Sequence, residues 1–193
     1  IAEYAWLRRT QLVATPRTKE KVTRLNQLLS LRAKLVKDCG GYKTRIKEML
    51  DTELISKSDL IYKTQKAVIT ALNGNIQKVE SEIETLIETD PELKNNFDLI
   101  RTIKGVGKIV AARMLAVTSN FKKFSNARKF NCYAGLAPFK HESGTSIRGR
   151  SRVSHLANKE IKTVLNLAAF CAIRFNQELK KKKKKRVSEG MKR

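Results

Sequence analysis

The sequence predicts a mainly α protein. It should form a long antiparallel helical hairpin or coiled coil, followed by a small helical domain with a helix-hairpin-helix-like motif and an irregular loop or short hairpin. Helix-forming Leu, Lys, Glu and Ala dominate the 193 residues, and only 9 Gly and 3 Pro interrupt them. Apolar residues recur at three- and four-residue steps over long stretches. Asp90-Pro91-Glu92 is a helix-start signal that separates the two parts.

The first part, residues 16–89, should be a coiled-coil or helical arm. A helix is expected from Arg17 to Asp38, ended by Gly40-Gly41, with a short helical stretch from Tyr42 to Leu54. A second long helix, from about Ser58 to Thr89, carries a narrow apolar seam: Val68, Leu72, Ile76, Val79, Ile83 and Leu86. The arm either packs on itself as a bundle or mediates homo-oligomerisation, and the narrow seams favour oligomerisation.

The second part, residues 90–180, should be a compact domain. Helices are expected over 91–103 and 109–117, and a short helix capped by Ser125 should end at Gly135. Residues 136–153 predict a loop or irregular hairpin, and a long amphipathic helix should run from Ser154 to about Lys180. Residues 181–193 form a basic tail. Residues 1–15 are interpreted as the end of a preceding domain, because Ile1 opens an apolar segment without Met.

Charge is the strongest global signal. The chain has 41 Lys and Arg against 18 Asp and Glu, a formal net charge of +23. Such an excess calls for a polyanion, usually nucleic acid, although a ribosome-like structural role also fits. Basic membrane helices place Trp and Phe opposite their charge, and that pattern is missing, so we expect no membrane partner. Three cysteines without a Cys-x-x-Cys pair favour a reducing, cytoplasmic location.

Gly105-Val106-Gly107 is the first candidate site. A Gly-x-Gly turn between helices exposes backbone N–H groups at a helix N-terminus, which can hold a phosphate. Lys104 and Lys108 flank the turn. The arrangement resembles a helix-hairpin-helix, a module that grips the DNA backbone. The alternative is a tight turn with no ligand, and the charge of the chain favours phosphate contact.

Ser143-Gly144, followed by Arg148, Arg150 and Arg152, is the second candidate site. A serine hydroxyl can attack a phosphodiester, and arginines can stabilise the charge that develops on phosphorus. From the residues alone this signal is weak, because a loop serine is ordinary and the arginines can serve only to bind phosphates. The nearby His141, Glu142 and His155 include possible bases. Two histidines and scattered carboxylates predict no metal or cofactor site in this chain.

Several motifs in one order resemble the C-terminal transposase domain of the insertion-sequence 110 family, which includes the pilin-gene-inverting recombinases. The matching features are Gly105-x-Gly107 with Ala111, Phe124, the run Tyr133-Ala134-Gly135-Leu136-Ala137-Pro138, Ser143-Gly144, and Asn158 before the final helix. Residues 15–37 resemble the coiled coil of that family. The segment IAEYAW resembles the stretch after its N-terminal nuclease-like domain.

The resemblance implies a DNA transposase or site-specific recombinase, located in the bacterial cytoplasm at the nucleoid. By position Ser143 would be the nucleophile, and the enzyme would be an oligomer guided by a structured RNA. An N-terminal RuvC-like domain would hold magnesium through acidic residues that this chain lacks. As given, the fragment should therefore bind DNA without recombining it. His155-Leu156-Ala157 also departs from the family's Lys-Arg-Gly. The alternatives are a non-enzymatic nucleic-acid-binding module and an inactive remnant.

Overall fold

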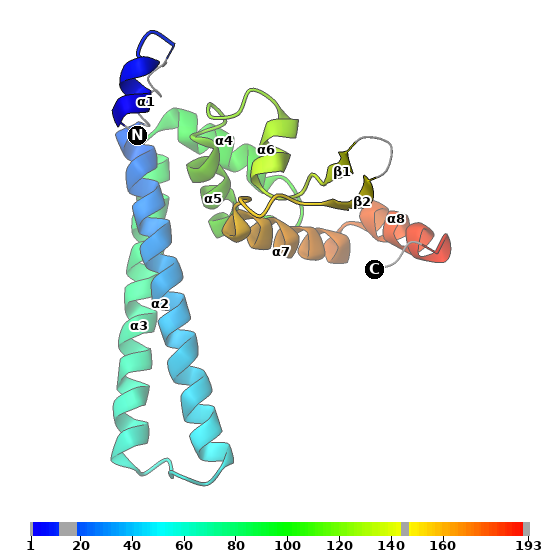
Figure 1. The fold of residues 1–193 in the computed structure, drawn as a ribbon. Coiled ribbons are helices and arrows are strands. Elements are labelled where there is room, and N and C mark those ends of the chain that lie inside the picture. The colour runs from blue at the N-terminus through cyan, green and yellow to red at the C-terminus, as the bar shows by residue number, and fades with distance from the viewer. Residues whose placement is uncertain (1, 12–18, 144–146, 191–193) are drawn as a thin grey trace.

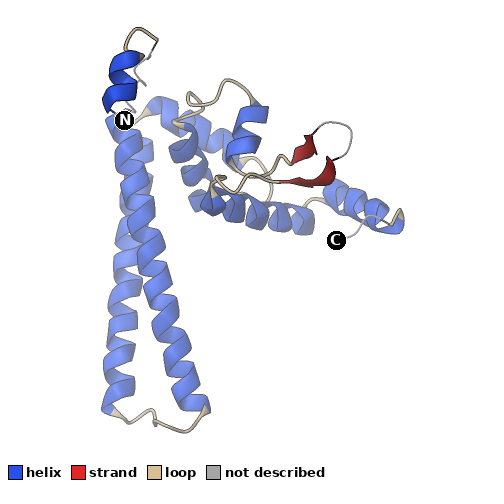
Figure 2. Ribbon diagram, viewed as in Figure 1, coloured by secondary structure: helices blue, strands red, loops and turns tan. Residues whose placement is uncertain are grey.

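Two long helices form an arm that stands beside a smaller cluster of helices and one β-hairpin (Figure 1). The structure is a computed structural model, which describes residues 2–11, 19–143 and 147–190; the side chains of residues 140–148 are not described. Helices dominate it, and the described strands are confined to one antiparallel pair (Figure 2). The predicted mainly α class is confirmed. In the described residues, no helix is both long and apolar enough to span a bilayer.

The arm consists of α2 (Glu20–Asp51) and α3 (Leu60–Glu88), which run antiparallel along their length. Asp59 starts α3, because its side chain accepts a hydrogen bond from the Ile61 backbone N–H at 2.7 Å. A short exposed helix, α1 (Ala2–Leu7), precedes the arm. The predicted helical hairpin is therefore present, and both of its helices are longer than any described helix of the compact domain beside them (Figure 1).

Gly40-Gly41 does not end the first helix, and this prediction was wrong. Helix α2 continues through both glycines to Asp51, so the separate stretch predicted at 42–54 is part of it. A glycine inside a helix costs about 1 kcal/mol relative to alanine. Cys39 and Ile46, on either side of the pair, are buried with Ile69 of α3. This packing offsets the local cost, and the helix passes through.

The main core lies where the upper arm meets α4 (Pro91–Arg101) and α5 (Lys108–Thr118). It contains Val22, Leu25 and Leu29 of α2, Ile83 and Ile87 of α3, Leu93, Phe97 and Ile100 of α4, and Ala111, Ala112 and Leu115 of α5. Of the predicted seam of α3, only Ile83 is fully buried, and the other five members are half-buried. A two-helix hairpin covers each seam from one side only, which leaves part of it in contact with water.

Asparagine caps set the later helix boundaries. Asn126, not the predicted Ser125, caps α6 (Ala127–Tyr133) by accepting a hydrogen bond from the Lys129 N–H at 2.9 Å. The predicted helix 154–180 begins only with α7 (Lys159–Phe175) and breaks at Asn176, where α8 (Gln177–Ser188) starts. The lysine run therefore belongs to a separate helix rather than to the end of α7. Asn is a strong N-cap residue, and its side chain replaces the backbone partners that a continuous helix would supply.

Candidate nucleic-acid interface

The predicted loop or short hairpin is a β-hairpin. Strands β1 (Phe139–Ser143) and β2 (Ile147–Arg152) pair antiparallel, with Ser143 opposite Ile147 and a register shift between Phe139 and His141. Ser143 is the last residue of β1, and Gly144 lies outside the described residues. The backbone thus places the candidate nucleophile at the turn end of the hairpin, the end farthest along the chain from the flanking helices.

The base of the hairpin is closed by Tyr133 and Asn158. The Asn158 backbone N–H donates to the Tyr133 carbonyl at 2.8 Å, and its side-chain amide donates to the Tyr133 hydroxyl at 3.0 Å. The amide oxygen of Asn158 also accepts from the Ile161 N–H at 3.0 Å and starts α7. Gly135 (φ 67°) lies so close to Ala157 and Val153 that an added Cβ would collide with the Ala157 Cβ at 2.8 Å. These contacts tie the end of α6 to the start of α7.

The arginines and the possible bases lie on or beside this hairpin. Arg150 and Arg152 are exposed on β2, two residues apart and so on one face of the strand. The backbone of Arg148 pairs with that of Glu142, and His141 pairs with Gly149. Outside the hairpin, His155 is exposed in the segment that leads to α7. The backbone thus brings the serine and all three arginines into one hairpin.

The two glycines of the Gly-x-Gly turn have different surroundings. Gly105 adopts φ 98°, as a glycine-requiring turn predicts, and it packs against α7. An added Cβ would lie 2.4 Å from the Ala172 backbone nitrogen, so this glycine allows the turn to pack closely against α7. Gly107 caps α5 with extended backbone and open space around it. Lys104 and Lys108 are exposed, and the Lys108 amine lies 2.6 Å from a Glu84 carboxylate oxygen.

One charged residue of the core was not predicted. Arg113 of α5 is buried; its guanidinium donates to the Leu29 carbonyl of α2 at 3.3 Å and lies 2.6 Å from a Glu160 carboxylate oxygen in the first turn of α7. Burial lowers the pKa of this guanidinium, and the nearby Glu160 charge opposes that shift. The available signal was an arginine inside the apolar run AARMLA. Its partners are distant in sequence, so the pattern alone did not identify them.

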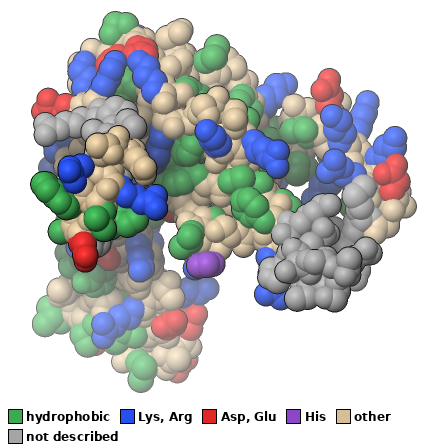
Figure 3. Space-filling view, turned by 45° about the horizontal axis from the view of Figure 1, so that its top comes forward, with side chains coloured by type: hydrophobic (Ala, Val, Ile, Leu, Met, Phe, Trp, Pro, Cys, Tyr) green, Lys and Arg blue, Asp and Glu red, His purple; other side chains and the backbone are tan. Residues whose placement is uncertain are grey.

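Basic side chains dominate the end of the molecule that carries α8. In the face shown in Figure 3, Lys and Arg side chains gather over this end, with few acidic side chains among them. Helix α8 itself carries seven consecutive basic residues, Lys180–Lys185 and Arg186. Among the described residues, no three His, Cys, Asp or Glu side chains are grouped closely enough to hold a metal ion.

Comparison with known proteins supports a relation to transposases. Residues 97–184 match the "Transposase IS116/IS110/IS902 family". The chain is 35% identical over 97 residues to a pilin gene-inverting protein of Moraxella lacunata and 34% identical over 97 residues to that of Moraxella bovis. Each match covers 50% of this chain and 30% of the relative.

A third relative is an IS110 insertion element protein of Streptomyces coelicolor. It is 29% identical over 115 residues, which are 60% of this chain and 27% of that protein. The chain therefore corresponds to less than a third of each relative. The matched family segment runs from α4 into α8 and contains the Gly-x-Gly turn, the serine hairpin and the Tyr133–Asn158 contact. Over residues 97–184, this chain is therefore similar to transposases of the IS116/IS110/IS902 family.

Proposed function

We propose that the chain is part of a DNA transposase or site-specific recombinase that cleaves and rejoins strands through Ser143. The observation that carries the proposal is the family match over residues 97–184, which includes a hairpin with this serine and three arginines. The exposed Arg150 and Arg152 would bind the phosphates of the DNA around the reacting bond. Lys104, Gly107 and Lys108 would contribute a second phosphate contact at the α4–α5 turn.

The proposed reaction is a transfer of a phosphodiester to the serine and back. The Ser143 oxygen attacks phosphorus, the bond from phosphorus to one deoxyribose oxygen breaks, and the serine proton leaves to a base. The released deoxyribose oxygen takes up a proton. A hydroxyl end of another strand then attacks the phosphoserine, which restores the serine and joins the strands. The bond count is conserved in both steps, so no oxidant or nucleotide cofactor is required. Guanidinium groups would offset the charge on the five-coordinate phosphorus.

The remaining partners are also proposals. The half-buried seam of α3 supports homo-oligomerisation through the arm. A structured guide RNA and a magnesium-binding RuvC-like domain follow from the resemblance. The described part of this chain offers no group of ligands for that magnesium, so no step is assigned to the metal here. By itself the chain would bind DNA without recombining it.

The test is a search for a covalent protein–DNA adduct. The chain, joined to the RuvC-like domain expected from the resemblance, is incubated with labelled DNA that contains the ends of the insertion element. The incubation is done with and without RNA transcribed from that element. Adducts are separated on a denaturing gel. Ser143→Ala should abolish the labelled adduct and leave DNA binding largely intact. Ser151→Ala is the matched control, because Ser151 lies on the other strand of the same hairpin and should leave the adduct in place.

An adduct that survives Ser143→Ala refutes the nucleophile. DNA binding without an adduct in any arm, including those with RNA, favours the non-enzymatic module or the inactive remnant. An adduct that requires the transcript supports guidance by RNA, and one that forms equally without it contradicts guidance.

A further inference from the structure

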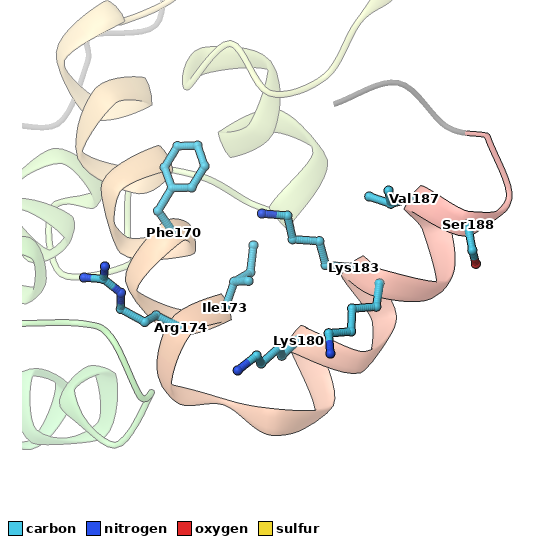
Figure 4. Close-up of a pocket in the computed structure, with 8 residues that line it drawn as sticks. Phe170, Ile173, Arg174, Lys180, Lys183, Val187 and Ser188 are labelled. Atoms are coloured by element: carbon cyan, nitrogen blue, oxygen red, sulfur yellow. The ribbon is translucent and has the colours of Figure 1, made fainter.

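A groove between α7 and α8 combines an apolar floor with a basic rim. Its volume is about 600 Å³, and its lining residues are Phe170, Ile173, Arg174, Lys180, Lys183, Lys184, Val187 and Ser188. In Figure 4, Phe170 and Ile173 point from α7 toward the space between the helices, and Lys183 extends into it from α8. Four of the eight lining side chains are basic and none is acidic.

The cap at Asn176 sets the angle that opens this groove. The Asn176 backbone N–H donates to the Ala172 carbonyl at 2.7 Å, which completes the last turn of α7. The Asn176 side chain then accepts from the Glu178 N–H at 3.0 Å and starts α8. If the helix continued straight through this point, Phe170 and Val187 would lie on one rod and no groove would form. The groove is thus built into the backbone by a defined capping residue.

Phe170 is the unusual member of the lining. It is 66% exposed, although a phenylalanine gains free energy from burial, and it lies among cations. A flat aromatic ring beside several lysines is the arrangement that binds unpaired nucleic acid, in which a base stacks on the ring and phosphates meet the charges. A duplex keeps its base faces stacked on each other and offers none to this ring. An apolar partner protein would leave the four cations without counter-charge.

We infer that the α7–α8 groove binds an unpaired strand of nucleic acid, with a base stacked on Phe170 and backbone phosphates on Arg174, Lys180 and Lys183. The Gly-x-Gly turn lies close to this groove, since Gly105 packs on Cys171 and Ala172, which follow Phe170 in α7. The inference is independent of the serine chemistry. Ser143→Ala should leave this binding unchanged, so failure of one proposal does not entail failure of the other.

The test measures fluorescence anisotropy of the full chain with labelled oligo(dT) and oligo(U) of about 20 nucleotides, longer than one such site, and with a duplex of equal length. Phe170→Ala should weaken binding of the single strands about 5- to 150-fold, the range for loss of one base–aromatic stack. Phe175→Ala is the matched control, because Phe175 has the same 66% exposure on α7 but does not line the groove. Phe175→Ala should leave the affinity for the single strands unchanged. Phe170→Ala should leave the affinity for the duplex unchanged.

The lysines provide a second comparison at constant net charge. Lys180→Gln with Lys183→Gln removes two rim charges, whereas Lys181→Gln with Lys182→Gln removes two charges from the same helix outside the groove. The first pair should reduce the slope of log affinity against log salt by about 1.4, because each phosphate contact to a single strand contributes about 0.7. The second pair should change the slope by clearly less.

Equal effects of Phe170→Ala and Phe175→Ala, or of the two lysine pairs, would overturn the inference and leave α8 as a diffuse polycation. An equal loss of duplex binding in Phe170→Ala would also overturn it. So would the finding that Phe170→Ala weakens binding of an acidic helical peptide and leaves binding of the oligonucleotides unchanged. A preference for oligo(dT) or for oligo(U) supports the inference and identifies the bound strand as DNA or RNA. Circular dichroism of each variant confirms that the helices are intact.

Discussion

Replacing Glu160 with Gln should destabilise the protein more than replacing the arginine that Glu160 neutralises. The Arg113–Glu160 and Lys108–Glu84 ion pairs have the same N–O separation of 2.6 Å. They differ in the cation, since the Arg113 side chain is 8% exposed and that of Lys108 is 53% exposed. Arginine does not give up its proton in a protein, so Glu160→Gln leaves a buried positive charge. Removing Arg113 instead leaves a carboxylate that is already half in water.

The expected sizes follow from burial. Glu160→Gln should cost about 1.5–2 kcal/mol, the lower part of the range for a hydrogen bond to a buried charged group. Arg113→Met should cost about 1 kcal/mol or less, because Met refills the space of the arginine stem and the Leu29 carbonyl retains its partner within α2. Glu84→Gln, the exposed control, should cost about 0–1 kcal/mol. The double variant Arg113→Met with Glu160→Gln should be no less stable than Arg113→Met alone.

Thermal unfolding followed by circular dichroism measures these differences. In a chain of this size, 1 kcal/mol moves the melting temperature by about 2–4 °C, so Glu160→Gln should lower it by about 3–8 °C. The reasoning fails if Arg113→Met is the more destabilising single change, or if Glu160→Gln costs no more than Glu84→Gln. Additive effects in the double variant would show that the two side chains act independently, which also contradicts it.

Two further predictions concern the Gly-x-Gly turn and the start of α4. Gly105→Ala should lower the free energy of unfolding by about 2–4 kcal/mol, because φ is 98° and the new methyl would lie 2.4 Å from the α7 backbone. Gly107→Ala has open space around it and should cost less than about 1 kcal/mol. Chemical denaturation measures both, and equal costs would contradict the packing role of Gly105. Hydrogen bonds from Lys122 and Lys19 hold the pKa of Glu92 below its ordinary 4.5, so this carboxylate stabilises the fold above that pH and the contribution is lost as pH falls through the lowered value. Glu92→Gln should therefore lower the melting temperature slightly at pH 7. It should also reduce the drop in melting temperature between pH 5 and pH 2, and an unchanged drop would contradict the stabilising role of these ion pairs.

The helices could be predicted where the signal is local. Asp90 followed by Pro91 gave the start of α4, and the residue spacing gave both helices of the arm. Gly40-Gly41 was wrongly read as a stop, because the packing of Cys39 and Ile46 on the facing helix does not show in the local pattern. The helix boundary at Asn176 was not predicted, because the apolar spacing continues past it and the cap depends on a single side chain.

The candidate site could be predicted in part. Ser143 and its arginines lie close together in sequence, so a hairpin brings them into one unit without help from the rest of the fold. The position of Gly105 required a contact with Ala172, and the partner of Arg113 lies on another helix. The α7–α8 groove depends on an angle between helices that no spacing encodes. Contacts between distant segments are what the sequence pattern leaves open.

The contact between Tyr133 and Asn158 makes the segment between them a closed loop that begins and ends at one point of the fold. Both ends of residues 134–157 are fixed by hydrogen bonds that involve only α6, the start of α7 and their connecting residues. The hydrogen bonds that join α6 to α7 are made by Tyr133 and Asn158 themselves, so substitutions in the hairpin between them leave these bonds in place. Such an arrangement allows the sequence of the hairpin to vary while the connection between α6 and α7 persists. It also makes residues 136–153 the segment to exchange between this chain and its relatives when the proposed function is tested.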